Sequence, residues 1–201
     1  MTTLTLDNIS VGALEGVNLS LHGGDIVCVS GPSGSGKSRL LRAVADLDPH
    51  QGTVVLDAMQ QGSVPGHRWR RQVMLVPADS QWWHEDVGAH FEPEHRSLPG
   101  ALGLPPEAMD WAVSRLSSGE RQRLAIARAL ARQPRVLLLD EPTANLDEDM
   151  TRQVESWLLE EIRARDLIVI WIAHDIGQIE RVASRHYRIQ GNTLEPVHGS
   201  H

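Results

Sequence analysis

The sequence predicts an α/β fold built on a mostly parallel sheet, and three observations lead to that prediction. Apolar runs of strand length alternate with stretches of helical periodicity along most of the chain. Several runs are apolar at consecutive positions, as in Val136–Leu139 and Leu167–Ala173, which is typical of parallel strands covered on both faces. The first strands instead alternate apolar and polar residues, which predicts a small antiparallel β layer at the N-terminus.

The N-terminal part of the chain contains most of the predicted strands. VNLSLH alternates as a half-buried strand does, whereas DIVCVS is apolar on both faces at its centre, as a central parallel strand should be. SRLLRAVADL has helical periodicity. We therefore expect strands at Thr3–Leu6, Val17–His22, Asp25–Ser30, Thr53–Asp57 and Val73–Val76, and a helix over 38–47.

The middle of the chain is less regular. Residues 79–106 include Trp82, Trp83 and four prolines, which predicts an irregular segment with little helix. A short helix is expected over 107–115. GERQRLAIARALAR, residues 119–132, is rich in strong helix formers and is followed by Pro134, which predicts a well-defined helix.

The C-terminal part returns to strand–helix alternation. We expect buried strands at Val136–Asp140 and Leu167–Ile172, helices over 148–164 and 175–183, and a hairpin of 185–190 with 193–195 around Gly191-Asn192. The helix over 148–164 is amphipathic, with Met150, Val154, Trp157, Leu158 and Ile162 on one face. We expect one domain over 1–201, with a core of about 1–78 and 136–201 and an inserted helical segment of about 79–135.

Composition excludes several classes of protein. The chain has 201 residues, of which 41% are hydrophobic and 22% charged, which is an ordinary globular balance. Its net charge of −7 argues against non-specific nucleic-acid binding, so no nucleic-acid partner is expected. One cysteine, Cys28, excludes an internal disulfide. No run approaches the length of a membrane span and no signal peptide is visible, so a cytoplasmic location is expected.

The only lysine of the chain lies in a glycine-rich segment. Residues 31–38, GPSGSGKS, match the pattern G-x-x-x-x-G-K-[ST] between a predicted strand and a predicted helix. The glycines allow successive N–H groups to converge on phosphate oxygens at the start of a helix. Lys37 would then bridge terminal phosphates, and the Ser38 hydroxyl would ligate Mg²⁺. The alternative is a Gly/Ser turn carrying a surface lysine.

Charged side chains follow two of the buried strands. Asp140 is the last residue of the predicted strand Val136–Asp140, and Glu141 follows it directly. Residues at the carboxyl ends of parallel strands face the crevice in which ligands bind. Asp140 suits Mg²⁺ ligation, directly or through water, and Glu141 suits general-base attack by water. The alternative is a solvated acidic turn. His174 and Asp175 follow the next strand. His174 could contact a terminal phosphate or could hold Glu141 and water in line, and the alternative is a helix cap at Asp175 beside a bystander histidine.

Five segments in order resemble the nucleotide-binding domain of ABC (ATP-binding cassette) transporters. They are GPSGSGKS, LSSGERQR (116–123), LLLDEP (137–142), Ala144-Asn145-Leu146-Asp147 and IAHD (172–175). The resemblance covers nearly the whole chain, and LSSGE, the signature, is its most specific element. It implies a P-loop NTPase core that binds and hydrolyses Mg-ATP. The ATP-binding residues it implies are Gly31, Pro32, Ser33, Gly34, Ser35, Gly36, Lys37, Ser38 and Arg39, with Ser38 and Asp140 at the metal.

The resemblance also implies catalytic residues and partners. Lys37, Glu141 and His174 would be catalytic. Two copies would pair head to tail, with ATP between the phosphate loop of one and the signature of the other. The residues implied at that interface are Ser117, Ser118, Gly119 and Glu120, which would contact the partner's ATP, and Asp147 at the dimer seam. A separate transmembrane permease would hold the pair at the inner face of the membrane. A purely local alternative makes Ser117 or Ser118 a helix N-cap with Glu120 or Arg123 in the first turn.

The sequence departs from the family at two points that bear on activity. Ala78 stands where the family has a glutamine after Arg71–Pro77. Gln81 could replace that glutamine only if the loop is rearranged, and Asp79 is another candidate. No aromatic residue precedes the phosphate loop, so Val11 or Leu14 would have to contact adenine.

The sequence allows two roles for Trp82 and Trp83 and two alternative functions for the chain. Trp82 and Trp83 are either anchors for the membrane partner or core residues of the inserted segment. A soluble ABC ATPase of cofactor (iron–sulfur) assembly is one alternative function, and a nucleotide switch with little turnover is the other.

Overall fold

The computed structural model describes residues 1–197, and residues 198–201, from which the sequence analysis draws nothing, lie outside the described residues. The strands are β1 (Thr3–Val11), β2 (Leu14–His22), β3 (Ile26–Ser30), β4 (Gln51–Leu56), β5 (Met59–Gln60), β6 (Val73–Val76), β7 (Val136–Asp140), β8 (Ile168–Ile172), β9 (Arg185–Gln190) and β10 (Thr193–Pro196). The α-helices are α1 (Lys37–Val44), α2 (Gly66–Gln72), α3 (Ser118–Ala131), α4 (Glu148–Arg165) and α5 (Ile176–Val182). The predicted α/β class is confirmed.

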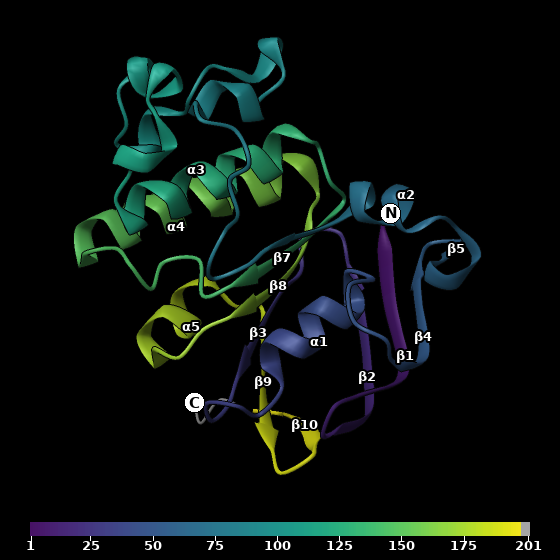
Figure 1. The fold of residues 1–201 in the computed structure, drawn as a ribbon. Helices are drawn as coiled ribbons and strands as arrows, with labels where there is room; N and C mark the ends of the chain where they lie inside the picture. The colour runs from purple at the N-terminus through teal and green to yellow at the C-terminus, as the bar shows by residue number, and fades with distance from the viewer. Residues whose placement is uncertain (198–201) are drawn as a thin grey trace.

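Two sheets form the framework. β2-β1-β4-β5 is antiparallel, and β10-β9-β3-β8-β7-β6 is parallel from β9 to β6, with β10 antiparallel at one edge. The predicted N-terminal β layer is therefore present, and its first strand is longer than expected. Helix α1 lies between the two sheets, while α3, α4 and α5 cover the opposite face of the larger sheet (Figure 1).

Successive side chains of the parallel strands point to opposite faces of the sheet and belong to two different hydrophobic cores. On β7, Leu137 and Leu139 join the core under α3 and α4, whereas Val136 and Leu138 join the core around α1. Side chains two residues apart share a face of a strand, so Asp140 continues the α1 side. The carboxyl end of β7 thus aims a carboxylate at the helix that follows the phosphate loop.

Most predicted elements are present, with one exception, and one α-helix was not predicted. Residues 107–115 are not an α-helix: they form two 3₁₀ turns, Pro106–Asp110 and Val113–Arg115, separated by extended Trp111 and Ala112. Asp86 forms a β-bridge with Ala112, and the backbone hydrogen bonds from Val87 N to the Trp111 carbonyl and from Val113 N to the Glu85 carbonyl hold this stretch extended. Sequence analysis missed α2, whose buried Trp69 donates from Nε1 to the Val44 carbonyl at 2.8 Å.

The segment between β6 and α3 contains only 3₁₀ turns as regular structure, as predicted for 79–106. They are Val87–His90, Pro93–His95 and Gly100–Leu102, besides the two turns within 106–115. The division of the chain into a core and an inserted segment remains a prediction. Throughout residues 1–197, every helix is too short or too polar to cross a bilayer.

Candidate functional site

The glycine-rich loop connects β3, the strand between β8 and β9, to α1. Three of its glycines have positive φ, with Gly31 at 149°, Gly34 at 74° and Gly36 at 102°. Such backbone geometry strains residues with a Cβ, which explains why glycine recurs here. Gly36 is the N-cap of α1 and offers no side chain to the first N–H groups of the helix. Those groups are therefore available to an anion, which the positive end of the helix also favours.

Lys37 is buried and folds back across the same loop. Its Nζ donates to the carbonyls of Gly31 and Pro32, both at 2.9 Å, and the residue is only 6% exposed. Burial lowers the pKa of Lys37, while the nearby Glu141 and Asp140 oppose that change. The alternative of a surface lysine on a Gly/Ser turn is therefore wrong. Within the described residues the buried Ser35 hydroxyl has no hydrogen-bond partner, so it is available to bind a ligand of the loop.

Asp140 approaches the start of α1 from the end of β7. It is 8% exposed, and burial raises the pKa of its carboxyl, an effect that a hydrogen bond from Ser38 opposes. A hydroxyl and a carboxylate oxygen thus adjoin beside the phosphate loop. This is the kind of oxygen pair that Mg²⁺ takes together with phosphate oxygens. The residues present fit that ion, although the ligand roles of Ser38 and Asp140 remain predictions.

Glu141 and His174 form a pair at the ends of β7 and β8. His174 Nε2 lies 2.8 Å from Glu141 Oε1, and the two side chains remain 48% and 36% exposed. Glu141 has φ of 49°, a left-handed conformation uncommon for a side chain of this kind, and its N–H donates to the Ile172 carbonyl at 3.2 Å. Strained backbone of this type is frequent at functional sites. His174 therefore contacts the candidate general base, and the neighbouring Asp175 caps α5 as the alternative expected. A catalytic role for His174 remains a prediction.

The signature is built as a helix cap. Ser117 Oγ accepts from Glu120 N at 3.2 Å, and Glu120 Oε2 accepts from Ser117 N at 2.8 Å, which forms a capping box at the start of α3. The backbone hydrogen bond from Ser117 lowers the pKa of Glu120. The predicted capping role of Ser117 with Glu120 is confirmed, and it leaves open whether Ser117, Ser118, Gly119 and Glu120 also contact a nucleotide.

The signature lies against the segment after Glu141 rather than beside the phosphate loop. A Cβ on Gly119 would lie 3.0 Å from the Asn145 carbonyl oxygen, a contact so tight that a side chain here would displace the segment slightly. Asp147, two residues further on, caps α4 by accepting from Met150 N at 2.8 Å. Among residues 1–197, no side-chain hydrogen bond or ion pair joins the signature to the phosphate loop.

Three residues near the phosphate loop were expected to contact adenine or ATP. Val11 and Leu14 are 3% and 0% exposed and belong to the core of the N-terminal sheet, and both also line a surface hollow beside Gly12. Their contact with adenine remains a prediction. The Arg39 side chain lies over Gly12 and within 4.0 Å of Asp48, away from the loop, and its predicted ATP contact remains a prediction.

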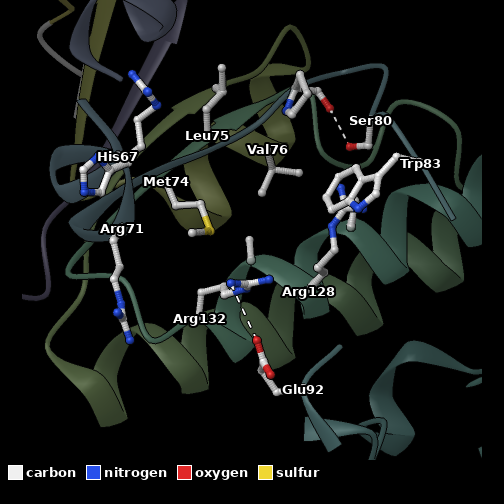
Figure 2. Close-up of a pocket in the computed structure, with 14 residues that line it drawn as sticks. His67, Arg71, Met74, Leu75, Val76, Ser80, Trp83, Glu92, Arg128 and Arg132 are labelled. Atoms are coloured by element: carbon white, nitrogen blue, oxygen red, sulfur yellow. Dashed lines mark hydrogen bonds and ion pairs between the residues drawn. The ribbon is translucent and has the colours of Figure 1, made fainter. Parts of the chain in front are cut away.

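A groove of about 590 Å³ lies between α2, β6 and α3, and the sequence did not predict it (Figure 2). Apolar side chains of β6 form part of its wall, and the basic residues around it are His67, Arg70, Arg71, Arg128 and Arg132. Arg128 is stacked on Trp82 and Trp83, with its guanidinium carbon 4.3 and 4.9 Å from their ring centres. Burial, and then repulsion from Arg132, lowers the pKa of Arg128 to about 10. An excess of positive charge therefore surrounds an apolar wall.

The two tryptophans at this groove have different environments. Trp83 is 64% exposed and lines the groove, whereas Trp82 is partly buried and packs on the core under α3. The interpretation as a core residue therefore holds for Trp82, whereas the interpretation of Trp83 as an anchor for a membrane partner remains a prediction. Ala78 and Asp79 are exposed beyond β6, and Gln81 accepts from Arg128 only through its backbone carbonyl, at 3.1 Å. Nothing in the structure shows which residue substitutes for the missing glutamine.

Comparison with known proteins decides the family. The protein-family model described as "ABC transporter" matches residues 14–144. The chain belongs to the ABC transporter family. The match begins in β2 and ends just after Glu141, so it includes the phosphate loop, the signature and the carboxylate pair. The resemblance that the sequence motifs predicted is thereby confirmed.

Relatives and a solved structure agree with this assignment. The chain is 40% identical over 188 residues to the Fe(3+) ions import ATP-binding protein FbpC of Streptomyces coelicolor, covering 86% of this chain and 53% of the relative. It is 36% identical over 191 residues to the aliphatic sulfonates import ATP-binding protein SsuB of Pseudomonas entomophila, covering 90% and 68%. A bacterial Atm1-family ABC exporter solved with ATP bound superposes with a TM-score of 0.81 at 26% identity, covering 96% of this chain and 37% of the exporter.

The chain spans about half the length of the first curated relatives it matches, 53% and 54%. The names of those relatives concern import, whereas the solved structure is an exporter. Direction and substrate of transport therefore differ among the proteins that this ABC domain is similar to.

Proposed function

We propose that this chain binds and hydrolyses ATP and that two copies, closing on two ATP molecules, drive transport through a separate transmembrane permease. The observation that carries the proposal is the convergence of Lys37, Ser38, Asp140, Glu141 and His174 at the carboxyl ends of three neighbouring parallel strands. That edge is where open α/β sheets bind their ligands. The names of the relatives support ATP binding as the common activity of this family.

In this proposal the phosphate loop supplies binding and charge. The N–H groups at the start of α1 contact the phosphates, and Lys37 turns its ammonium from the Gly31 and Pro32 carbonyls toward the terminal phosphates. Gly34 and Ser35, with the remaining residues of 31–39, form the rest of the cradle. Bound Mg²⁺, held by Ser38 and Asp140, would neutralise phosphate charge.

Glu141 and His174 carry the hydrolytic step. The Glu141 carboxylate accepts a proton from the attacking water, a role worth about 10²–10⁴ in rate. His174, hydrogen-bonded to the same carboxylate, fixes its direction and faces the terminal phosphate. Both side chains are accessible enough to receive water and nucleotide.

The pairing of two copies explains why the signature lies apart from the phosphate loop of its own chain. The open N–H groups at the start of α3, together with Ser117, Ser118 and Gly119, form an anion site that no group of this chain occupies within residues 1–197. A second copy would present its ATP there, and Asp147 would lie at the seam. Glu120 stays in its capping box and shapes the site without donating to the phosphate.

The permease would dock in the groove between α2, β6 and α3. Trp83 offers a large exposed apolar surface at its rim, and Arg71, Arg128 and Arg132 surround it with positive charge. Tryptophan and arginine are the residues that most often anchor interfaces. We place the chain in the cytoplasm, held at the inner membrane face by this contact.

A second candidate is a nucleotide switch with little turnover, and Ala78 favours it. The exposed methyl group of Ala78 replaces an amide that the family resemblance places near the metal. ATP affinity without hydrolysis, in the presence of a membrane partner, would identify this second function.

Substitution of the only lysine tests the phosphate assignment. Mg-ATP at 100 times its Kd should stabilise the wild-type chain by about 2.7 kcal/mol, measured as a rise in Tm, because ligand binds only the folded state. Lys37→Ala should abolish that rise, whereas Arg163→Ala, which removes an exposed cation of α4, should retain it. An undiminished rise in Lys37→Ala would refute the assignment.

A further inference from the structure

A buried polar network lies directly behind the Glu141–His174 pair. Glu155 of α4 is 3% exposed, and Arg181 of α5 donates to both of its carboxylate oxygens, at 2.9 and 3.1 Å. Gln178 of α5 is 8% exposed and donates from Nε2 to Glu155 Oε1 at 2.7 Å and to Thr143 Oγ1 at 2.8 Å. Three segments, α4, α5 and the turn after Glu141, therefore meet at one amide.

The chemistry of the neighbours fixes how this amide is oriented. A carboxylate only accepts hydrogen bonds, so the Gln178 atom beside Glu155 must be the NH₂ group. Its second hydrogen then points at the Thr143 hydroxyl, which accepts. Arg181 forms an ion pair with Glu155, and the second N–H of Gln178 donates to Thr143 in the turn after Glu141.

The Gln178 amide provides one of two hydrogen bonds that flank Glu141 and His174. On one side, Glu141 N donates to the Ile172 carbonyl, which joins the ends of β7 and β8 two residues before His174. On the other side, Thr143 and Gln178 join the turn after Glu141 to the first turn of α5, whose N-cap, Asp175, directly follows His174. The exposed Glu141–His174 contact therefore lies between two hydrogen bonds. The one from Glu141 N to the Ile172 carbonyl is a backbone hydrogen bond, and the one from Gln178 to Thr143 joins side chains.

We propose that Gln178 is a positioning residue, which holds the Glu141 carboxylate and the His174 imidazole in register through Thr143. The proposal rests on the proposed function for its effect on turnover, but its structural half does not. The α5 N-cap strengthens the geometry, since Asp175 accepts from Gln178 N at 2.6 Å and thereby ties the residue after His174 to the same glutamine. Among the described residues, Gln178 itself forms no hydrogen bond with Glu141 or His174.

A double-mutant cycle on turnover tests the proposal. Gln178→Leu removes both donors but leaves Glu155 paired with Arg181, and Thr143→Val removes the acceptor at nearly constant shape. Each change should lower kcat for ATP about ten-fold or more while KM changes little, because a misplaced catalytic pair affects the reaction more than nucleotide binding. The double variant should be no slower than either single one, since both remove the same hydrogen bond.

Two variants separate positioning from a general loss of structure. Thr143→Ser keeps the accepting hydroxyl and should retain wild-type kcat. Gln153→Leu, on the exposed face of α4, makes the same chemical change away from the network and should also retain it. Additive losses in the double variant, or a loss confined to KM, would overturn the proposal.

A measurement without turnover separates this proposal from the proposed function. The ¹⁵N resonances of the His174 ring report the hydrogen bond at Nε2 in the chain without nucleotide, assigned by their absence in His174→Asn. Gln178→Leu and Thr143→Val should shift them in the same direction, and Thr143→Ser should not. Unchanged resonances in both variants would overturn the positioning role, whereas an inactive wild-type chain with shifted resonances would overturn only the proposed function.

Discussion

The edge that carries the phosphate loop and the segment between β6 and α3 are built differently. At the first, parallel strands end side by side, and short hydrogen bonds fix Lys37 and the Glu141–His174 pair. At the second, about forty residues form only 3₁₀ turns, and a single buried histidine, His90, organises much of the loop around the tryptophans.

The two regions are stabilised by different interactions. The strand ends are fixed by regular sheet pairing, so a few side chains are enough to finish a site. The irregular segment depends on individual contacts, such as Arg123 Nη1 donating to the Leu102 carbonyl at 2.6 Å and Arg128 stacked between groove and core. Changes at the strand ends should therefore affect chemistry, and changes in the segment should affect local stability and partner binding.

The largest effect is expected at the strand ends. Glu141→Gln should lower ATP turnover at least about 100-fold while nucleotide binding persists, because the amide keeps the shape of the side chain but cannot accept the water proton. Phosphate release from the purified chain measures the effect. Glu160→Gln, the same change at an exposed position of α4, should leave turnover unchanged. If Glu141→Gln turned over ATP at the wild-type rate, another group would be the base.

The neighbouring tryptophans of the irregular segment should differ in their effect on stability. Trp82→Ala removes a side chain packed on the core and should cost about 2 kcal/mol, less than the loss of a fully buried tryptophan. Trp83→Ala removes an exposed ring and should cost less than about 1 kcal/mol, mainly its stacking with Arg128. Urea unfolding of the two variants checks this order, and equal costs would contradict the division of roles.

A smaller effect is expected from pH. His90 is 3% exposed, and its Nε2 accepts from Trp83 N at 3.0 Å and His84 N at 3.1 Å, so this nitrogen carries no proton. Burial, with further repulsion from Arg128 and His84, lowers the pKa of His90 in the folded chain. The unfolded chain then takes up this proton first as pH falls, and folding free energy is lost below about pH 6.5.

The His90 effect can be isolated by substitution. Between pH 7.5 and 5.5 the wild-type Tm should fall more than the Tm of His90→Asn, which is already lower at pH 7.5 but has no imidazole to protonate. The exposed His67→Asn serves as the matched control and should follow the wild type. Parallel Tm losses in all three chains would show that His90 does not carry the pH dependence.

Sequence could predict most of the strand edge because its signals are local. The spacing of GPSGSGKS, the apolar run before Asp140 and the carboxyl-end rule place the main groups without knowledge of the rest of the fold. The burial of Val11 and Leu14 was not predictable, because it depends on how a distant sheet packs on α1. The 3₁₀ turns at 107–115 likewise follow from a bridge between Asp86 and Ala112, which helical periodicity in the sequence does not reveal.

The network behind the reactive pair has a weaker signal that sequence reasoning missed. Gln178 lies one helical turn after His174 on the buried side of α5, a position where a polar residue needs partners. Glu155 interrupts the apolar face of α4 in the same way, between Val154 and Trp157. A polar residue beside the predicted apolar face of α4 indicates a buried partner, but only the fold shows that this partner is Gln178 of α5.

Light scattering on Glu141→Gln tests the central claim most directly, namely that two copies share their ATP sites. With hydrolysis blocked, saturating Mg-ATP should convert the protein from monomer to dimer, and omission of either Mg²⁺ or ATP should leave it monomeric. The signature variant Ser117→Arg, in the same background, should bind ATP and stay monomeric. A Glu141→Gln protein that binds Mg-ATP and never pairs would contradict the account.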